Sequence, residues 1–499
     1  MHLAFALAPI ALLLVLLLGA RWSAASAGAA SAAVALLLAV TAFDTGTAIV
    51  PTVAGPMLEA LFQSATILWI IFPALCIHEY QTRSGATALF GRALAGLSDD
   101  PRIVALLIAW FFVLFLEGAA GFGTPIALAA PLLVAAGFTP HAALLLALVG
   151  NAAAVPFGAI GTPMAPLIAE TGLDPHRLSL AVVLLNASVG WMMATMLVRI
   201  AAIDRLAPAG GAIIWGGGAA VLFFLPSALI AWTTGSELPT LGGALAGGLA
   251  FGLLVRRRAR ADGSMDDMPS GGALARAALP YLIVVGLILV TRLVPPFEAI
   301  LRGVAIDWTT DGGYVGTVAP LHHPGTMLMV AFVAGGLLVR GGGTQLPGAV
   351  CDAARRLPRV ALALVAVLTL ARTMVHSGMI ELLASATANA IGGALPLISP
   401  MLGALGAFVT GSGTASNILF AGFQASAAEQ AGVPPMLTVA AQAVGAAAGN
   451  LIAPHNIVAG AATVGLIGRE GEILRRTLPI ALAYAGAAGI VALLVMLAL

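Results

Sequence analysis

Residues 117–125 read EGAAGFGTP, and residues 410–417 read TGSGTASN. The two runs lie inside long apolar stretches, 103–170 and 396–466, which glycine and proline interrupt too often for regular membrane spans. Non-helical backbone at membrane depth is tolerated only inside protein or beside a water-filled cavity. Glycine permits both a tight turn and the close approach of a ligand to the backbone. We therefore expect each run to form the tip of a re-entrant helical hairpin.

The composition of the chain predicts an all-α polytopic membrane protein. Of the 499 residues, 60% are hydrophobic and only 9% are charged, whereas a soluble domain carries about a quarter charged residues. The lipid bilayer must therefore be the solvent for most of the chain, and helices are the expected spanning elements. The net charge of +1 gives no reason to expect a nucleic-acid partner.

Other apolar segments are clean candidates for single transmembrane helices. They are residues 3–20, 26–43, 62–78, 178–198, 211–231, 238–255, 278–294, 325–339, 360–379 and 478–499. With one broken span in each glycine-rich stretch, they predict about twelve transmembrane helices plus the two hairpins.

The order of these segments predicts an inverted repeat. The expected parts are a first half, 1–205, with a hairpin at 103–136 and a broken helix at 140–170; a connecting helical hairpin and Arg-rich linker, 206–276; and a second half, 277–499, with a hairpin at 396–430 and a broken helix at 435–466. Inverted repeats with broken helices in matching places are typical of secondary transporters.

Arginine distribution predicts the orientation. The densest basic cluster opens the linker between Arg256 and Arg276, and the positive-inside rule places such a linker in the cytoplasm. Counting spans outward from it leaves both termini in the periplasm, so the second half enters the membrane from the opposite side to the first.

The hairpin tips and broken helices predict an anion-binding site near the middle of the membrane. A helix that restarts after a turn offers free N–H groups and a positive dipole end, and nearby hydroxyl and amide groups add donors. The candidate substrate-binding residues are Gly121, Gly123, Thr124, Asn151, Ser412, Gly413, Thr414, Ser416, Asn417, Asn450 and His455. For the glycines and hydroxyls, the alternative is ordinary helix packing, and for the amides it is helix capping.

Ionisable groups at membrane depth are costly and usually functional. Glu117 is the candidate proton carrier because burial disfavours the charged form of a carboxyl; a structural ion pair or helix cap is the alternative. Arg372 suits bidentate binding of a carboxylate, although pairing with Glu117 or Asp44 is also open. His376, one turn later, could relay protons or be a satisfied core histidine.

These residues carry a resemblance to the L-lactate permease family. The matching segments are Phe115 through Gly123, Asn151 through Pro163, Thr171 through Asp174, Arg372 with Ser377 through Met379, Gly413 through Phe420, Gln442 through Asn456, and Gly465 through Glu470. The resemblance implies a bacterial inner-membrane symporter that imports L-lactate, glycolate or a related 2-hydroxymonocarboxylate with protons. It also implies an elevator-type fold with hairpins and a homodimer. Thr162 and His455 depart from the family pattern, in which an aliphatic residue and a glutamine are expected.

Two other functions compete with this interpretation. The first is a carrier of another small organic anion with sodium coupling. The second is a membrane-embedded enzyme, which the sequence disfavours because it contains neither His-Glu-x-x-His nor Gly-x-Ser-x-Gly. We expect no catalytic residues, no metal site and no cofactor.

Overall fold

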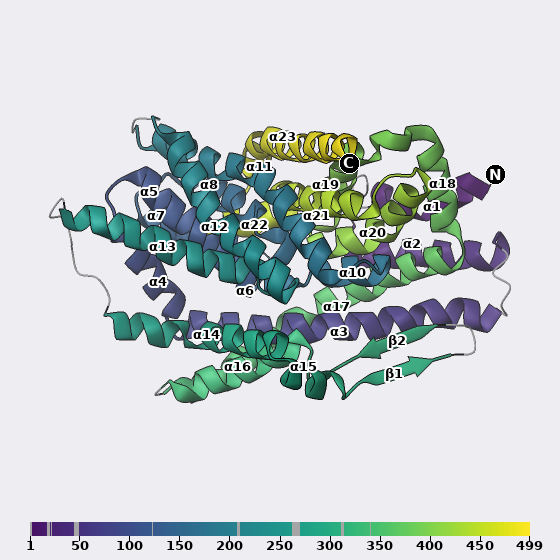
Figure 1. Ribbon diagram of the computed structural model, residues 1–499, viewed down its shortest axis with the longest axis horizontal. Helices are drawn as coiled ribbons and strands as arrows, with labels where there is room; N and C mark the ends of the chain where they lie inside the picture. The colour runs from purple at the N-terminus through teal and green to yellow at the C-terminus, as the bar shows by residue number, and fades with distance from the viewer. Residues whose placement is uncertain are drawn as a thin grey trace.

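The computed structural model describes residues 2–16, 20, 22–43, 49–121, 123–206, 210–261, 270–310, 314–339 and 341–499. Asp44, one expected partner of Arg372, lies outside these residues, as does the middle of the Arg-rich linker, 262–269. The chain is helical almost throughout, which confirms the predicted fold class (Figure 1).

The first part of the chain consists of helices. They are α1 (His2–Leu14), α2 (Ala24–Thr41), α3 (Ile49–Arg83), α4 (Ala86–Ala95), α5 (Pro101–Ala105), the π-helix η2 (Leu106–Phe112), α6 (Val113–Ala119), α7 (Thr124–Ala135), α8 (Pro140–Ala152), η3 (Val155–Phe157), α9 (Gly158–Gly161), α10 (Met164–Thr171), α11 (Pro175–Asp204), α12 (Ala212–Thr234) and α13 (Pro239–Ala261).

The rest of the chain adds one short ribbon. Its elements are α14 (Gly271–Leu293), α15 (Pro295–Arg302), β1 (Ile306–Thr309), β2 (Val315–Val318), α16 (Pro324–Leu338), η4 (Gly342–Gln345), α17 (Leu346–His376), α18 (Met379–Ile391), η5 (Gly392–Ala394), α19 (Leu395–Thr410), α20 (Gly413–Gln430), α21 (Pro435–Ile452), α22 (Pro454–Thr463) and α23 (Glu470–Ala498). The two strands pair antiparallel, with Ile306 opposite Val318.

Among the described residues, ten helices are long and apolar enough to cross a membrane, or eleven if the bent pair α8 with η3–α9 is one span. This count is slightly below the expected one. The expected spans 3–20, 26–43 and 325–339 correspond to α1, α2 and α16, which are apolar but shorter than the about 20 residues that a span needs. Two of the ten helices, Pro101–Ala119 and Met379–Thr410, instead include the first limbs of the expected hairpins.

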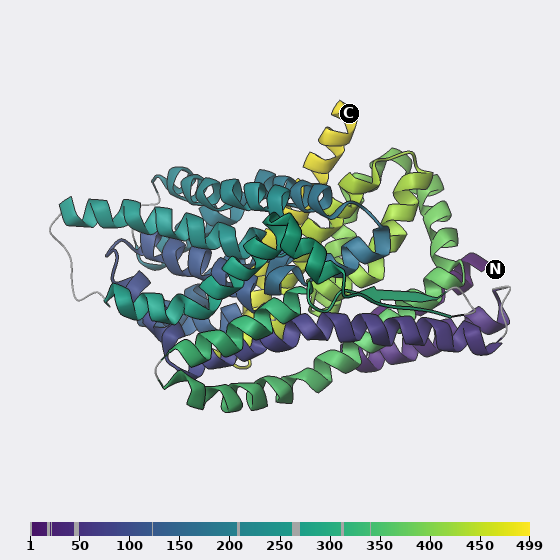
Figure 2. The same ribbon diagram turned by 60° about the horizontal axis from the view of Figure 1, so that its bottom comes forward.

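Two long helices run antiparallel along the length of the molecule. The expected spans 62–78 and 360–379 belong to α3, with 35 residues, and α17, with 31. Glu59 meets His376 at one end of the pair, and Arg83 meets Asp352 at the other. Both views show α3 along one side of the molecule (Figure 1, Figure 2). In an inverted repeat, the first long helix of one half runs antiparallel to the equivalent helix of the other half, as α3 and α17 do.

Matching glycine contacts hold each hairpin against its broken helix. A Cβ on Gly150 of α8 would lie 1.6 Å from the Ala109 carbonyl oxygen, and one on Gly449 of α21 would lie 2.1 Å from that of Ala404. An asparagine follows each glycine, and the Asn151 amide donates to Asn450 Oδ1 at 3.4 Å. The two halves therefore meet at equivalent positions in their sequences.

Gly150→Ala is expected to destabilise the protein by about 1–3 kcal/mol, because the methyl group overpacks against the rigid backbone of the hairpin. Thermal unfolding of the purified variant in detergent measures the effect. Gly218→Ala in α12 is the matched control, since no atom lies within 4 Å of its added Cβ. Equal melting temperatures for the two variants would contradict the close contact.

Candidate substrate site

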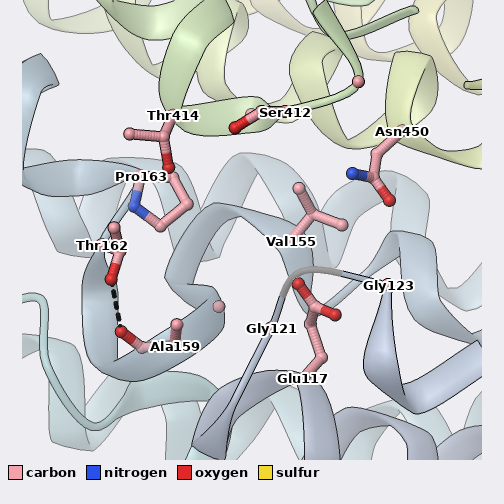
Figure 3. A pocket seen from close by; sticks show the side chains of 13 residues that line it. Glu117, Gly121, Gly123, Val155, Ala159, Thr162, Pro163, Ser412, Thr414 and Asn450 are labelled. Carbon is pink, nitrogen blue, oxygen red and sulfur yellow. Dashed lines mark hydrogen bonds between the residues drawn. The ribbon is translucent and has the colours of Figure 1, made fainter. Parts of the chain in front are cut away.

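A small cavity of about 30 Å³ lies where the two hairpin tips meet the unwound middle of the first broken helix. Its walls come from four separate segments of the chain: the two hairpin tips, the first broken helix and, at Asn450, the second broken helix (Figure 3). The lining residues are Glu117, Gly121, Gly123, Val155, Gly158, Ala159, Thr162, Pro163, Gly411, Ser412, Gly413, Thr414 and Asn450.

The first hairpin turns at glycines with left-handed backbone. Gly121 has φ +62° and Gly123 has φ +74°, conformations that cost glycine little. A Cβ on Gly123 would also lie 2.6 Å from Asn456 Oδ1. The Thr124 hydroxyl donates to the Gly121 carbonyl at 2.7 Å, so Thr124 fixes the turn and does not line the cavity.

The first broken helix contains a buried left-handed turn. Ala159 has φ 42° and ψ 58°, and Ile160 has φ 53° and ψ 49°. Such conformations cost non-glycine residues about 1–3 kcal/mol each and persist only where the surroundings enforce them. The Thr162 hydroxyl donates to the Ala159 carbonyl at 2.6 Å, the bond drawn in Figure 3. The turn brings Gly158 so close to Glu117 that an added Cβ would lie 2.6 Å from Oε1.

The second hairpin turns over only two residues. Gly411 ends α19 with φ +75°, and the Ser412 hydroxyl caps α20 by accepting from the Ala415 N–H at 3.3 Å. The next N–H groups, on Gly413 and Thr414, have no acceptor among the described residues. Both residues line the cavity, so the positive end of α20 faces it and can bind an anion.

Glu117 faces the same cavity from the other wall. Its residue is 5% exposed, and its Oε2 atom is buried without a hydrogen-bond partner in the described part of the chain. Figure 3 shows the carboxyl group directed toward the space below Val155. An unpaired buried carboxylate is costly, so this group needs a proton or a cation when the site is closed.

Several predicted site residues lie outside the cavity and contact the segments that line it. Asn417 donates to the Pro163 carbonyl at 2.9 Å, and Ser416 donates to the Gly403 carbonyl at 2.8 Å. Asn151 reaches Asn450, which also accepts from Asn456 at 2.8 Å. His455 is exposed and lies beside the second tip, with its Nδ1 atom 2.3 Å from the position of a Cβ on Gly411. These contacts fit the capping and packing alternatives.

Arg372 does not line the cavity. Its Nη2 atom donates to Glu170 at 2.7 Å, and its Nε atom donates to Gln63 at 3.3 Å. His376 donates from Nε2 to Glu59 at 2.8 Å. We call Glu59, Glu170, Arg372 and His376 the Arg372 cluster. These ion pairs lie inside the protein, and the binding of a substrate carboxylate by Arg372 stays a prediction.

The sequence reasoning missed the two carboxylates of this cluster, together with Val155 and Ala159 of the cavity. Glu59 and Glu170 carried the same signal as Glu117, an acidic residue within an apolar stretch. Val155 and Ala159 carried none, because their position depends on the left-handed turn.

The sequence profile of the L-lactate permease family matches residues 3–316 and 313–499. The chain belongs to the L-lactate permease family. It is 30% identical to the glycolate permease GlcA of Escherichia coli (strain K12), over 98% of this chain and 94% of that protein. It is also 30% identical to the L-lactate permease of the same strain, over 93% and 90%.

Among solved structures, MtrF of Neisseria gonorrhoeae, described as one of a class of antimetabolite efflux pumps, is similar in fold. The TM-score is 0.50 and the identity 15%, over 89% of this chain and 83% of MtrF. Membership of a permease family makes the chain a multi-pass membrane transporter and not an enzyme.

Proposed function

We propose that the chain is a proton-coupled symporter that imports L-lactate, glycolate or a related 2-hydroxymonocarboxylate across the bacterial inner membrane. The relatives named for glycolate and L-lactate support the substrate class. The observation that carries the coupling is Glu117, a buried carboxyl whose Oε2 atom has no hydrogen-bond partner among the described residues and which faces the cavity between the hairpin tips.

The carboxylate of the substrate binds at the start of α20. The free N–H groups of Gly413 and Thr414 and the hydroxyls of Ser412 and Thr414 supply donors on that wall. The amide of Asn450, on the same cavity, is placed to recognise the 2-hydroxyl group. No fixed positive side chain lines the cavity among the described residues, so the helix end provides the attraction.

The proton resides on Glu117 while the substrate is bound. A bare carboxylate beside a substrate anion would place two negative charges in a buried site, which is strongly disfavoured. One proton for one monocarboxylate leaves the loaded site with little net charge, and such a site crosses the hydrocarbon region at far lower cost.

Transport then requires the cavity to face each side of the membrane in turn. The halves 1–205 and 277–499 are proposed as the inverted repeats, with hairpins and broken helices moving as an elevator relative to α3 and α17. We further propose a homodimer with periplasmic termini and a cytoplasmic Arg256–Arg276 linker.

Uptake into proteoliposomes tests this function. Radiolabelled L-lactate, glycolate, acetate and a dicarboxylate are compared with an inward proton gradient, an inward sodium gradient, or neither. We expect the two hydroxy acids to accumulate about tenfold for each pH unit of gradient. Accumulation that follows only the sodium gradient would favour the sodium-coupled alternative, and none with either gradient would reject symport.

A further inference from the structure

The Arg372 cluster contains two buried carboxylates and one fixed positive charge. The side chains of Glu59 and Glu170 are only 5% and 3% exposed. Among the described residues, the side chains of Gln63 and Tyr314 also contact the cluster, and both are uncharged. With His376 neutral, the cluster has a net charge of −1, and one added proton makes it zero. Because an unpaired buried charge is costly, the cluster needs one proton.

Arg372 has both carboxylates within reach. Its Nη2 atom lies 2.7 Å from Glu170, and its Nε atom lies 3.8 Å from Glu59. In the observed arrangement Arg372 pairs with Glu170, and the His376 ring pairs with Glu59; we assign the proton of the cluster to His376 in this arrangement. In the alternative, Arg372 pairs with Glu59, Glu170 holds the proton, and His376 is neutral. Both arrangements contain one proton and no net charge.

His376 is the most exposed member of the cluster. Its side chain is 30% exposed, far more than either carboxylate, and its ring lies 4.5 Å from that of Tyr314. Imidazole changes its charge near neutral pH. We therefore take the His376 ring, the most exposed member, as the place where protons enter and leave the cluster.

The cluster also joins the cavity wall to the long helices. Glu170 lies on α10, which begins directly after Thr162 and Pro163 of the cavity. Arg372 lies on α17, which contributes no lining residue to the cavity. The Arg372–Glu170 ion pair is thus a tie between α10 and α17. Only the observed arrangement keeps this tie.

We propose that the Arg372 cluster is a second proton-binding site, and that the position of its proton decides whether α10 is tied to α17. When the proton is on His376, Arg372 pairs with Glu170 and the tie is kept. A proton on Glu170 releases Arg372 to Glu59, and α10 can then separate without an unpaired charge on either side. This inference rests on the proposed function, because the tie affects transport only if α10 moves with the cavity.

Thermal stability in detergent tests the shared proton without any transport. At about pH 8, where a carboxyl holds a proton poorly, His376→Gln is expected to lower the apparent melting temperature by about 5 °C, since both carboxylates remain. Glu170→Gln removes one carboxylate. The double variant should therefore melt within about 2 °C of Glu170→Gln alone, although the two side chains belong to different helices. The shared proton would be overturned if the decreases in melting temperature of the two single variants simply add in the double variant. It would also be overturned if the double variant melts no higher than His376→Gln.

Exchange of external for internal labelled substrate, at equal pH on both sides, tests the tie. From about pH 5.5 to about pH 8 the wild-type rate is expected to fall about threefold or more, because a cluster that has lost its proton has none to place on Glu170 and the ion pair with Arg372 stays closed. Glu170→Gln, which cannot form the ion pair, should lose this change; the two profiles are compared in the Glu117→Gln background, so that the proton on Glu117 does not contribute to the pH dependence. Glu429→Gln, an exposed glutamate on α20, should behave as wild type.

The two measurements separate the inference from the proposed function. A wild-type protein that exchanges none of the acids contradicts the proposed function, and the melting temperatures still decide the shared proton. A wild-type profile that persists unchanged in Glu170→Gln overturns the tie while leaving the symport intact.

Discussion

Glu117→Gln is expected to exchange labelled for unlabelled lactate or glycolate across a proteoliposome membrane but not to accumulate it. Glutamine keeps the size and hydrogen-bonding capacity of a protonated glutamate but cannot release a proton. A gradient of one pH unit drives about tenfold accumulation through a one-proton symporter. The accumulation ratio of the variant should therefore fall to about one, while exchange continues because the loaded site is still neutral.

Substrate-driven proton uptake, followed with a dye inside the same vesicles, is the measurement that decides the role of Glu117. The control is Glu381→Gln, a surface glutamate at the start of α18, which should couple as wild type does. If Glu117→Gln still moves one proton with each substrate, Glu117 is not the coupling site. The Arg372 cluster and His455 would then be the remaining candidates.

The hairpins could be predicted from the sequence because their signal is local. The stretch expected as 396–430 folds as α19 and α20, Leu395–Gln430, with its tip at Gly411. A glycine that ends one helix and a serine that caps the next are adjacent residues, so the turn needs no distant contact. The first hairpin followed from the same kind of glycine run.

The partners of the buried charges could not be predicted in this way. Hydropathy gives the depth of Arg372 in the membrane, but not the direction of its side chain. Its contacts, Gln63 and Glu170, are 309 and 202 residues away in the sequence. They meet Arg372 only because α3 packs along α17 and the fold brings the Glu170 side chain of α10 within hydrogen-bonding distance. From the sequence alone, a role of Arg372 in substrate binding could not be distinguished from a role in an ion pair.

Arg372→Ala is expected to destabilise the protein by about 3–5 kcal/mol, because it leaves Glu59 and Glu170 buried without their shared cation. The Arg372 side chain is itself only 14% exposed, so solvent screens these charges poorly. Thermal unfolding in detergent measures the loss. Arg355→Ala on the same helix is the control, since its side chain is 80% exposed and surface ion pairs contribute little.

A second variant distinguishes an ion pair from a substrate contact. Adding Glu170→Gln to Arg372→Ala removes one of the two stranded carboxylates, and most of the lost stability should return. A substrate contact predicts a different result. If Arg372 held the substrate, Arg372→Ala would be as stable as wild type and would lose substrate binding altogether. Stability that is unchanged in Arg372→Ala, together with binding that is lost, would restore the role that the sequence alone favoured. Stability that is lost and then recovered in the double variant assigns Arg372 to the cluster, because only a buried carboxylate left unpaired explains both changes.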